Sequence, residues 1–141
     1  MKLIQMSNAV STSIASDAII NLGTVTRKEV LGDCNIFTNT NTSININRPG
    51  YYLVNVDANI ISGADGNLSI QLYDDSSPVT TALATVTSVA NSAYNLNFSK
   101  IIRVLPNCCS NVNNTPKTIS VYNTGVAGTA STINISVIKI N

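Results

Sequence analysis

Few residues in this sequence have side chains that commonly perform catalysis. The chain contains no histidine, so a serine or cysteine nucleophile would lack its usual imidazole base. Ser99 and Lys100 are adjacent on a predicted strand and therefore point to opposite faces. The glycines are isolated in turns, and the glycine-rich loop with Gly-Lys-Ser/Thr that cradles phosphate groups is absent. We therefore predict that the chain is not an enzyme and has no catalytic or cofactor-binding residue.

Carboxylates offer the remaining route to a metal site. Asp74 and Asp75 follow a predicted strand at 67–73 and could supply oxygen ligands to a hard cation such as Ca²⁺. The sequence Asp-Asp-Ser-Ser-Pro is also typical of a solvated turn in which an aspartate caps the backbone. We favour the turn and predict no metal ligand.

Three cysteines, Cys34, Cys108 and Cys109, make a poor disulfide framework because their number is odd. In an extended chain, Cys108 and Cys109 point to opposite faces and are badly placed to hold one metal ion. We expect three free thiols. The alternative is one disulfide from Cys34 to Cys108 or Cys109 across neighbouring strands.

Charge and hydropathy argue against two classes of partner. Charged residues make up 11% of the chain and the net charge is +1. The basic residues are scattered, whereas a nucleic-acid-binding protein needs a basic face to neutralise phosphates. No apolar run is long enough to span a membrane, and the N-terminal sequence lacks the apolar stretch of a secretory signal. We expect no nucleic-acid partner, no membrane insertion and no export by that route.

Alternation of apolar and polar residues predicts strands along most of the chain. Every second residue is apolar in 52–60 and again in 68–72. Between them, Asp65-Gly66 tolerates positive φ and predicts a hairpin turn. In 94–105 the apolar positions change parity, which predicts a bulge or a bend near Ser99 and Lys100. The other expected strands are 18–22, 25–30, 34–38, 44–46, 79–89, 117–123 and 131–140.

About eight to ten short strands, with little helical periodicity, predict an all-β sandwich or jelly roll of two sheets. The length of 141 residues suits one domain. We assign this domain to residues 21–141. Residues 1–20 are expected to form an N-terminal arm, as a candidate attachment segment, or a first strand.

Three of these strands, 51–61, 94–105 and 131–140, carry apolar side chains on both faces. The second face of strand 51–61 includes Tyr51, Leu53 and Ile61, and that of strand 131–140 includes Ile138 and Ile140. A strand that is apolar on both faces must be covered on both, and only another subunit can cover the outer face of a two-sheet sandwich. The second face of strand 51–61 is polar in its middle, so we expect a mixed interface. We predict an oligomer whose interface includes these five apolar residues.

The order of these segments, together with Arg48-Pro49-Gly50-Tyr51-Tyr52-Leu53-Val54, resembles the C1q and tumour-necrosis-factor-like (TNF-like) jelly rolls. In that family a Pro-Gly-hydrophobic-Tyr segment opens a central strand and a short hydrophobic strand closes the chain. The resemblance covers about residues 30–141 and is strongest to the C1q-like modules of bacteriophage virions and spore surfaces. It implies a homotrimer packed about a three-fold axis, with a structural or binding role.

The same resemblance implies a phage virion component, such as a capsid-decoration protein, a head fibre or a fibre tip. A virion protein assembles in the host cytoplasm, so it needs no export signal and can keep free cysteines. Its expected partners are a phage capsid protein or a glycan or receptor on the host surface. One alternative is a C1q-like adhesin module of a bacterial cell surface or spore coat. Another is a carbohydrate-active jelly roll, against which the shortage of carboxylates counts, because glycosidases usually need a pair.

Overall fold

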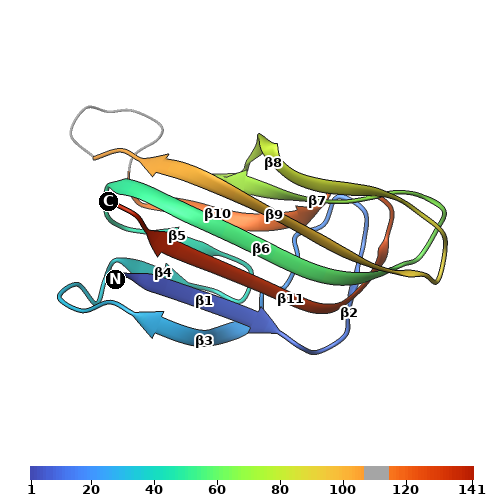
Figure 1. The fold of residues 1–141 in the computed structure, drawn as a ribbon, viewed down its shortest axis with the longest axis horizontal. Helices are drawn as coiled ribbons and strands as arrows, with labels where there is room; N and C mark the ends of the chain where they lie inside the picture. Colours follow the sequence, from blue (N-terminus) through green and yellow to red (C-terminus); the bar gives the residue numbers. More distant parts are fainter. Residues whose placement is uncertain (107–114) are drawn as a thin grey trace.

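The computed structural model of the protein describes residues 1–106 and 115–141. Within these ranges the chain forms β-strands and no helix, which confirms the all-β prediction (Figure 1). No helix of the described residues is therefore long and apolar enough to span a membrane. The strands are β1 (Leu3–Asn8), β2 (Thr12–Ile14), β3 (Thr24–Glu29), β4 (Phe37–Asn39), β5 (Ile44–Ile46), β6 (Gly50–Ser62), β7 (Gly66–Asp74), β8 (Ser77–Ser88), β9 (Ala93–Val104), β10 (Lys117–Asn123) and β11 (Gly128–Lys139).

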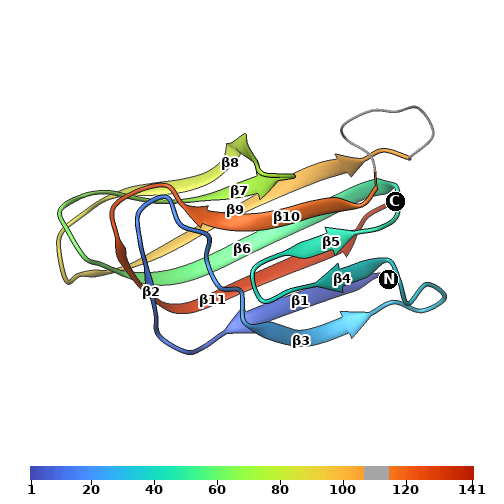
Figure 2. The same cartoon turned by 180° about the vertical axis from the view of Figure 1, so that it is seen from behind.

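The strands form two antiparallel sheets packed face to face. Sheet I has the order β3-β1-β11-β6-β9, with the short β2 also beside β11, and sheet II has the order β4-β5-β10-β7-β8. Sheet I lies in front in Figure 1, and sheet II lies in front when the molecule is turned (Figure 2). Consecutive strands repeatedly cross between the sheets, as in a jelly roll. This arrangement confirms the two-sheet sandwich.

The core lies between the sheets and follows from the two-residue period of the strands. In β6 every second residue from Tyr52 to Ile60 is at most 2% exposed. Sheet II contributes Leu68, Ile70 and Leu72 of β7, which are fully buried. Each such aliphatic side chain stabilises the fold by about 1.5–3 kcal/mol relative to an exposed one. The one-faced pattern of 67–73 is therefore the clearest strand signal in the sequence.

Tyr52 brings a polar group into this core. Its ring packs edge to face on Phe37 with 5.9 Å between centroids, and its hydroxyl donates a hydrogen bond to the Arg48 carbonyl oxygen at 2.7 Å. The Arg48 guanidinium in turn pairs with Asp33, with 2.8 Å between Nε and Oδ2. Burial, and to a smaller degree the Asp33 carboxylate, raises the pKa of Tyr52 to about 12, because both disfavour the phenolate.

Four local expectations are wrong. The hairpin expected between 52–60 and 68–72 does not form, because β6 lies in sheet I and β7 lies in sheet II. Segment 18–22 is not a strand: only Ile19 makes a bridge, to Tyr122 of β10. Segment 34–38 becomes strand only at Phe37. The bulge expected near Ser99 and Lys100 is absent, because β9 pairs with β6 in unbroken register from Ala93 to Val104. A bulge lies instead in β11, between Ala130 and Thr132.

Residues 1–20, expected as an arm or a first strand, contain β1 and β2. β1 lies inside sheet I, between β3 and β11. Its Ile4 and Met6 are fully buried in the core. This segment is therefore an integral part of the sandwich.

Candidate subunit interface

The five predicted interface residues all lie on the outer face of sheet I. The even-numbered residues of β6 from Tyr52 to Ile60 point into the core, so Tyr51, Leu53 and Ile61 point outward. The bulge in β11 shifts the parity of that strand and brings Ile138 and Ile140 to the same face. Tyr51, Ile61 and Ile140 are 45%, 39% and 53% exposed, and Leu53 and Ile138 are half-buried.

Four of these five residues gather at one end of the face. Leu53 is in register with Ile138 of β11 on one side and with Ile101 of β9 on the other. Ile140 donates its backbone N–H to the Tyr51 carbonyl oxygen at 2.8 Å. We call Tyr51, Leu53, Ile101, Ile138 and Ile140 the apolar end.

Ile101 was not among the five interface residues named from the sequence, although its strand, 94–105, was expected to take part in the interface. It is 57% exposed and lies beside Leu53. The unbroken alternation of Ala93, Asn95, Asn97, Ser99 and Ile101 was the signal that could have found it.

Arg103 extends the apolar end without burying its charge. Its guanidinium carbon lies 5.8 Å from the centre of the Tyr51 ring, within the range of a cation–π contact. At the exposed surface such a contact contributes about 0.5–1 kcal/mol. The pair holds the Tyr51 ring on the outer face.

Ile61 lies apart from the other four predicted residues. It is in register with Ala93 of β9 and with Thr129 of β11, at the opposite end of β6 from Tyr51. Between the two ends the face is polar. The predicted residues are therefore brought onto one face but into two separate places.

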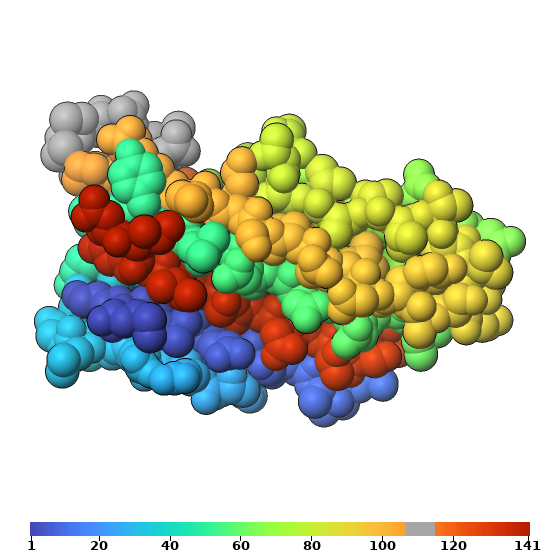
Figure 3. All heavy atoms as spheres, in the orientation of Figure 1, coloured from blue at the N-terminus to red at the C-terminus, as the bar shows by residue number. Residues whose placement is uncertain are grey.

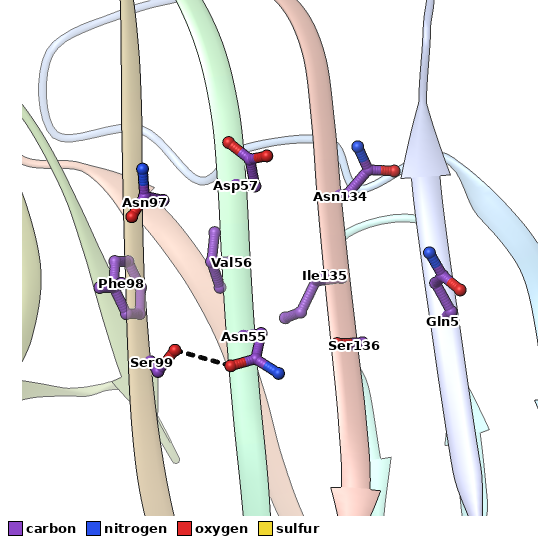
Figure 4. A pocket seen from close by; sticks show the side chains of 10 residues that line it. All are labelled: Gln5, Asn55, Val56, Asp57, Asn97, Phe98, Ser99, Asn134, Ile135 and Ser136. Carbon is purple, nitrogen blue, oxygen red and sulfur yellow. Dashed lines mark hydrogen bonds between the residues drawn. The ribbon is translucent and has the colours of Figure 1, made fainter.

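The middle of the face consists of small polar side chains in two rows, which Figure 4 shows from close by. Asn134, Asp57 and Asn97 form one row across β11, β6 and β9. Ser136, Asn55 and Ser99 form the next, with Gln5 of β1 beside Ser136. Because these side chains are short, the surface is hollowed here into a pocket of about 240 Å³. We call these seven residues the polar centre.

Side-chain hydrogen bonds link β9 to β6 in this region, and one runs along β9 itself. Asn95 of β9 donates its side-chain N–H groups to Asp57 Oδ1 at 2.7 Å and to Asn59 Oδ1 at 2.9 Å. Asn97 donates to Asn95 Oδ1 at 2.8 Å, and Ser99 Oγ donates to Asn55 Oδ1 at 2.7 Å. The outer face of sheet I is thus apolar at the end that carries Tyr51 and amide-rich in its middle.

The two aspartates considered as cation ligands both have protein partners. Asp74 binds the Lys117 ammonium through both carboxylate oxygens, at 2.8 and 2.7 Å. Asp75 Oδ1 accepts the backbone N–H of Thr118 at 2.8 Å. Among the described residues, no three His, Cys, Asp or Glu side chains gather into a potential metal site.

Of the cysteines, Cys34 is exposed in the loop before β4. Cys108 and Cys109 lie outside the described residues, so the expectation of free thiols stays a prediction.

Solved structures with the same fold include three of different biological origin. The globular domain of zebrafish complement 1qA matches with a TM-score of 0.66 and 10% identity, covering 100% of this chain and 98% of the other. Eiger TNF from S. frugiperda matches with a TM-score of 0.72 and 12% identity, covering 100% and 94%. PRD1 vertex protein P5 matches with a TM-score of 0.62 and 17% identity, covering 99% and 97%.

No protein-family model and no curated protein matches this sequence. The structural likeness, which spans the whole chain, establishes the fold class: the protein is a C1q/TNF-like jelly roll. The resemblance expected from the sequence is confirmed at this level.

Proposed function

We propose that the protein is a non-enzymatic structural and binding module of a phage virion and that it works as a homotrimer. It would serve as a capsid-decoration protein, a head fibre or a fibre tip, assembled in the host cytoplasm. Its partners would be a phage capsid protein or a glycan or receptor on the host surface. The observation that carries the proposal is the apolar end, where Tyr51, Ile101 and Ile140 are exposed on the outer face of sheet I. Figure 3 shows this face of the molecule.

The physical argument for assembly rests on this apolar end. Tyr51, Ile101 and Ile140 expose roughly half of their surface, and they lie together with Leu53 and Ile138. Contiguous apolar patches on soluble proteins commonly mark interaction sites. Stable interfaces remove about 1,200–2,000 Å² from water, and a closed ring of copies would cover this face in every subunit.

The virion role is supported by the likeness to a phage protein. PRD1 vertex protein P5 has the same fold over nearly the full length of both chains. A charged share of only 11% and the absence of histidine from the sequence also favour a structural or binding role.

Light scattering coupled to size-exclusion chromatography tests the assembly. We expect the mass of three chains at micromolar concentration, and Tyr51→Asp or Leu53→Asp should shift the protein toward monomer, because each copy would bury an unpaired carboxylate in the interface. Leu83→Asp is the matched control, since Leu83 is 41% exposed but lies on β8 of sheet II. A monomeric wild-type protein would refute the trimer.

Purified particles test the virion role. Mass spectrometry of virions from the source of this chain should detect its peptides, and immunogold labelling should place it on the particle. Detection on a bacterial cell or spore surface, with none on virions, would favour the adhesin alternative.

A further inference from the structure

We propose that the polar centre forms a layer of hydrogen bonds between subunits and that this layer fixes the number and register of the copies. The inference rests on the proposed trimer and goes beyond it, because it assigns assembly specificity to particular side chains. The occupant of the pocket is thus a second copy of this chain.

The first observation concerns hydrogen-bonding groups left over after the contacts within the chain. Asn134 accepts a hydrogen bond from the Ser7 hydroxyl and Asn55 accepts one from Ser99. Within the described residues, the side-chain N–H groups of both asparagines have no acceptor. The carbonyl oxygen of Asn97, the second oxygen of Asp57 and the Gln5 amide likewise have no partner there. All of these groups line the pocket and face outward (Figure 4).

Symmetry then decides what these groups meet. In a closed ring, every residue lies at the same level along the rotation axis as its copies. If the outer face of sheet I surrounds the axis, apolar ends meet apolar ends and polar centres meet polar centres. A side-chain amide carries both donors and an acceptor, so a face rich in asparagine complements a copy of itself.

The polar centre also penalises wrong arrangements. Buried polar groups cost free energy unless they find partners. If one subunit slid along another, the unpaired amide groups of the polar centre would face Leu53, Ile101 and Ile138. The side chains of these three residues offer no hydrogen-bond donor or acceptor. In coiled coils, a single buried asparagine specifies register and oligomeric state in this way, at some cost in stability.

Asp57 has a distinct effect in this layer. It is the sole charged residue that lines the pocket, and its only described side-chain donor is the neutral Asn95. Symmetry places the copies of Asp57 at one level, so their like charges oppose association. Asp57 should therefore limit the affinity of the trimer while the amides set its register.

Native mass spectrometry of purified full-length variants tests this inference. Leucine is close in size to asparagine, and the double variant Asn97→Leu, Asn134→Leu removes two amides while adding apolar surface. We expect the wild type to give one trimeric mass and the double variant to give several oligomeric masses. Asn67→Leu is the matched control, because Asn67 is exposed on β7 of sheet II and should leave a single trimer.

If the double variant precipitates, the single variant Asp57→Asn tests the same inference. This nearly isosteric change keeps the hydrogen bonds and removes the like charges, so the trimer should remain single and its dissociation concentration should fall about tenfold. An unchanged or higher dissociation concentration would overturn the inference. A double variant that stays a single trimer with wild-type affinity would overturn the inference alone, whereas a monomeric wild type would overturn the proposed trimer as well.

Discussion

At the scale of single residues, two polar groups inside or beside the core have a defined energetic effect. Burial raises the pKa of Tyr52, and Lys117 pairs with Asp74 in a site where the lysine side chain is only 3% exposed. In both cases the partner decides the cost of burial, because an unpaired polar group in the core destabilises the fold. Sequence alternation correctly predicted Tyr52 as inward-facing. It could not predict Lys117, since a lysine at the start of a strand is ordinarily exposed.

Tyr52 should make the fold sensitive to high pH. Its pKa is raised from 10 in the unfolded chain to about 12 in the folded protein. The unfolded state therefore loses its proton first, and stability that is complete below pH 10 declines as the pH rises toward 12. The full loss is roughly 3 kcal/mol, because the pKa rises by about two units and each unit corresponds to 1.36 kcal/mol.

Urea denaturation between pH 8 and 12 measures this effect. Tyr52→Phe should be less stable by about 1 kcal/mol at pH 8, where it lacks the hydrogen bond to the Arg48 carbonyl. Above pH 10 the free energy of unfolding of Tyr52→Phe should fall less than that of the wild type. The difference should equal the loss attributed to ionisation of Tyr52. Parallel curves for the two proteins would contradict the prediction.

Removing the partner of Lys117 should be costly. Asp74→Ala leaves the Lys117 ammonium without the carboxylate that binds it at 2.7 and 2.8 Å. Loss of one partner of a buried ion pair typically costs about 3–5 kcal/mol. Asp74 is itself about a quarter exposed, so we expect the lower end of that range in urea denaturation. Asp65→Ala, in the exposed turn before β7, should cost much less.

At the scale of elements, the success of prediction followed the visibility of the two-residue period. β6 and β7 were predicted because their inward residues are apolar and the residues between them are polar. For residues 1–20 the prediction stayed open between an arm and a first strand, because Leu3 and Ile4 are adjacent apolar residues and β1 is defined by its pairing with β11 at the other end of the sequence. A pattern of neighbouring residues cannot reveal a pairing with a strand that is so distant in the sequence.

The expected bulge in β9 shows a second limit. Lys100 pairs with the inward-facing Val54 and so shares its face, which makes the alternation look broken. β9 is an edge strand, so the lysine can reach past the core and hydrogen-bond the Thr81 hydroxyl of sheet II. A long side chain that buries its stem and keeps its charge near water is tolerated at such an edge. Because the alternation looked broken at Lys100, the outward position of Ile101 was not recognised from the sequence.

Gly23, directly before β3, should tolerate no side chain. Its φ is +79°, and a Cβ would lie 2.1 Å from the Ser7 carbonyl oxygen of β1. Gly32 has nearly the same φ, +81°, but open space around it. Gly32→Ala should thus cost about 1 kcal/mol for the left-handed backbone alone, and Gly23→Ala clearly more. Equal melting temperatures for the two variants would show that the approach of β3 to β1 is not restrictive.

At the scale of the whole molecule, the sandwich should hold together without metal or disulfide. The described residues contain no metal cluster, and the core is continuous between the two sheets. Differential scanning calorimetry with and without a chelator and a reductant should therefore give melting temperatures within a few degrees of each other, since a domain of this size can bury a sufficient core. A fall of tens of degrees would reveal a metal site or a disulfide among the cysteines.

The pairing of β1 with β11 has a further consequence for chain connectivity. The backbone N–H of Lys139 donates to the Lys2 carbonyl oxygen at 2.9 Å, and both termini lie at the same end of the molecule (Figure 1). A short flexible linker can therefore join them, and the chain can be reopened at the exposed turn between β6 and β7 without removing a ladder hydrogen bond. Such exposed turns are where circular permutation succeeds. The pairing of neighbouring strands would then determine the fold, and the chain ends could be moved to this turn without changing it.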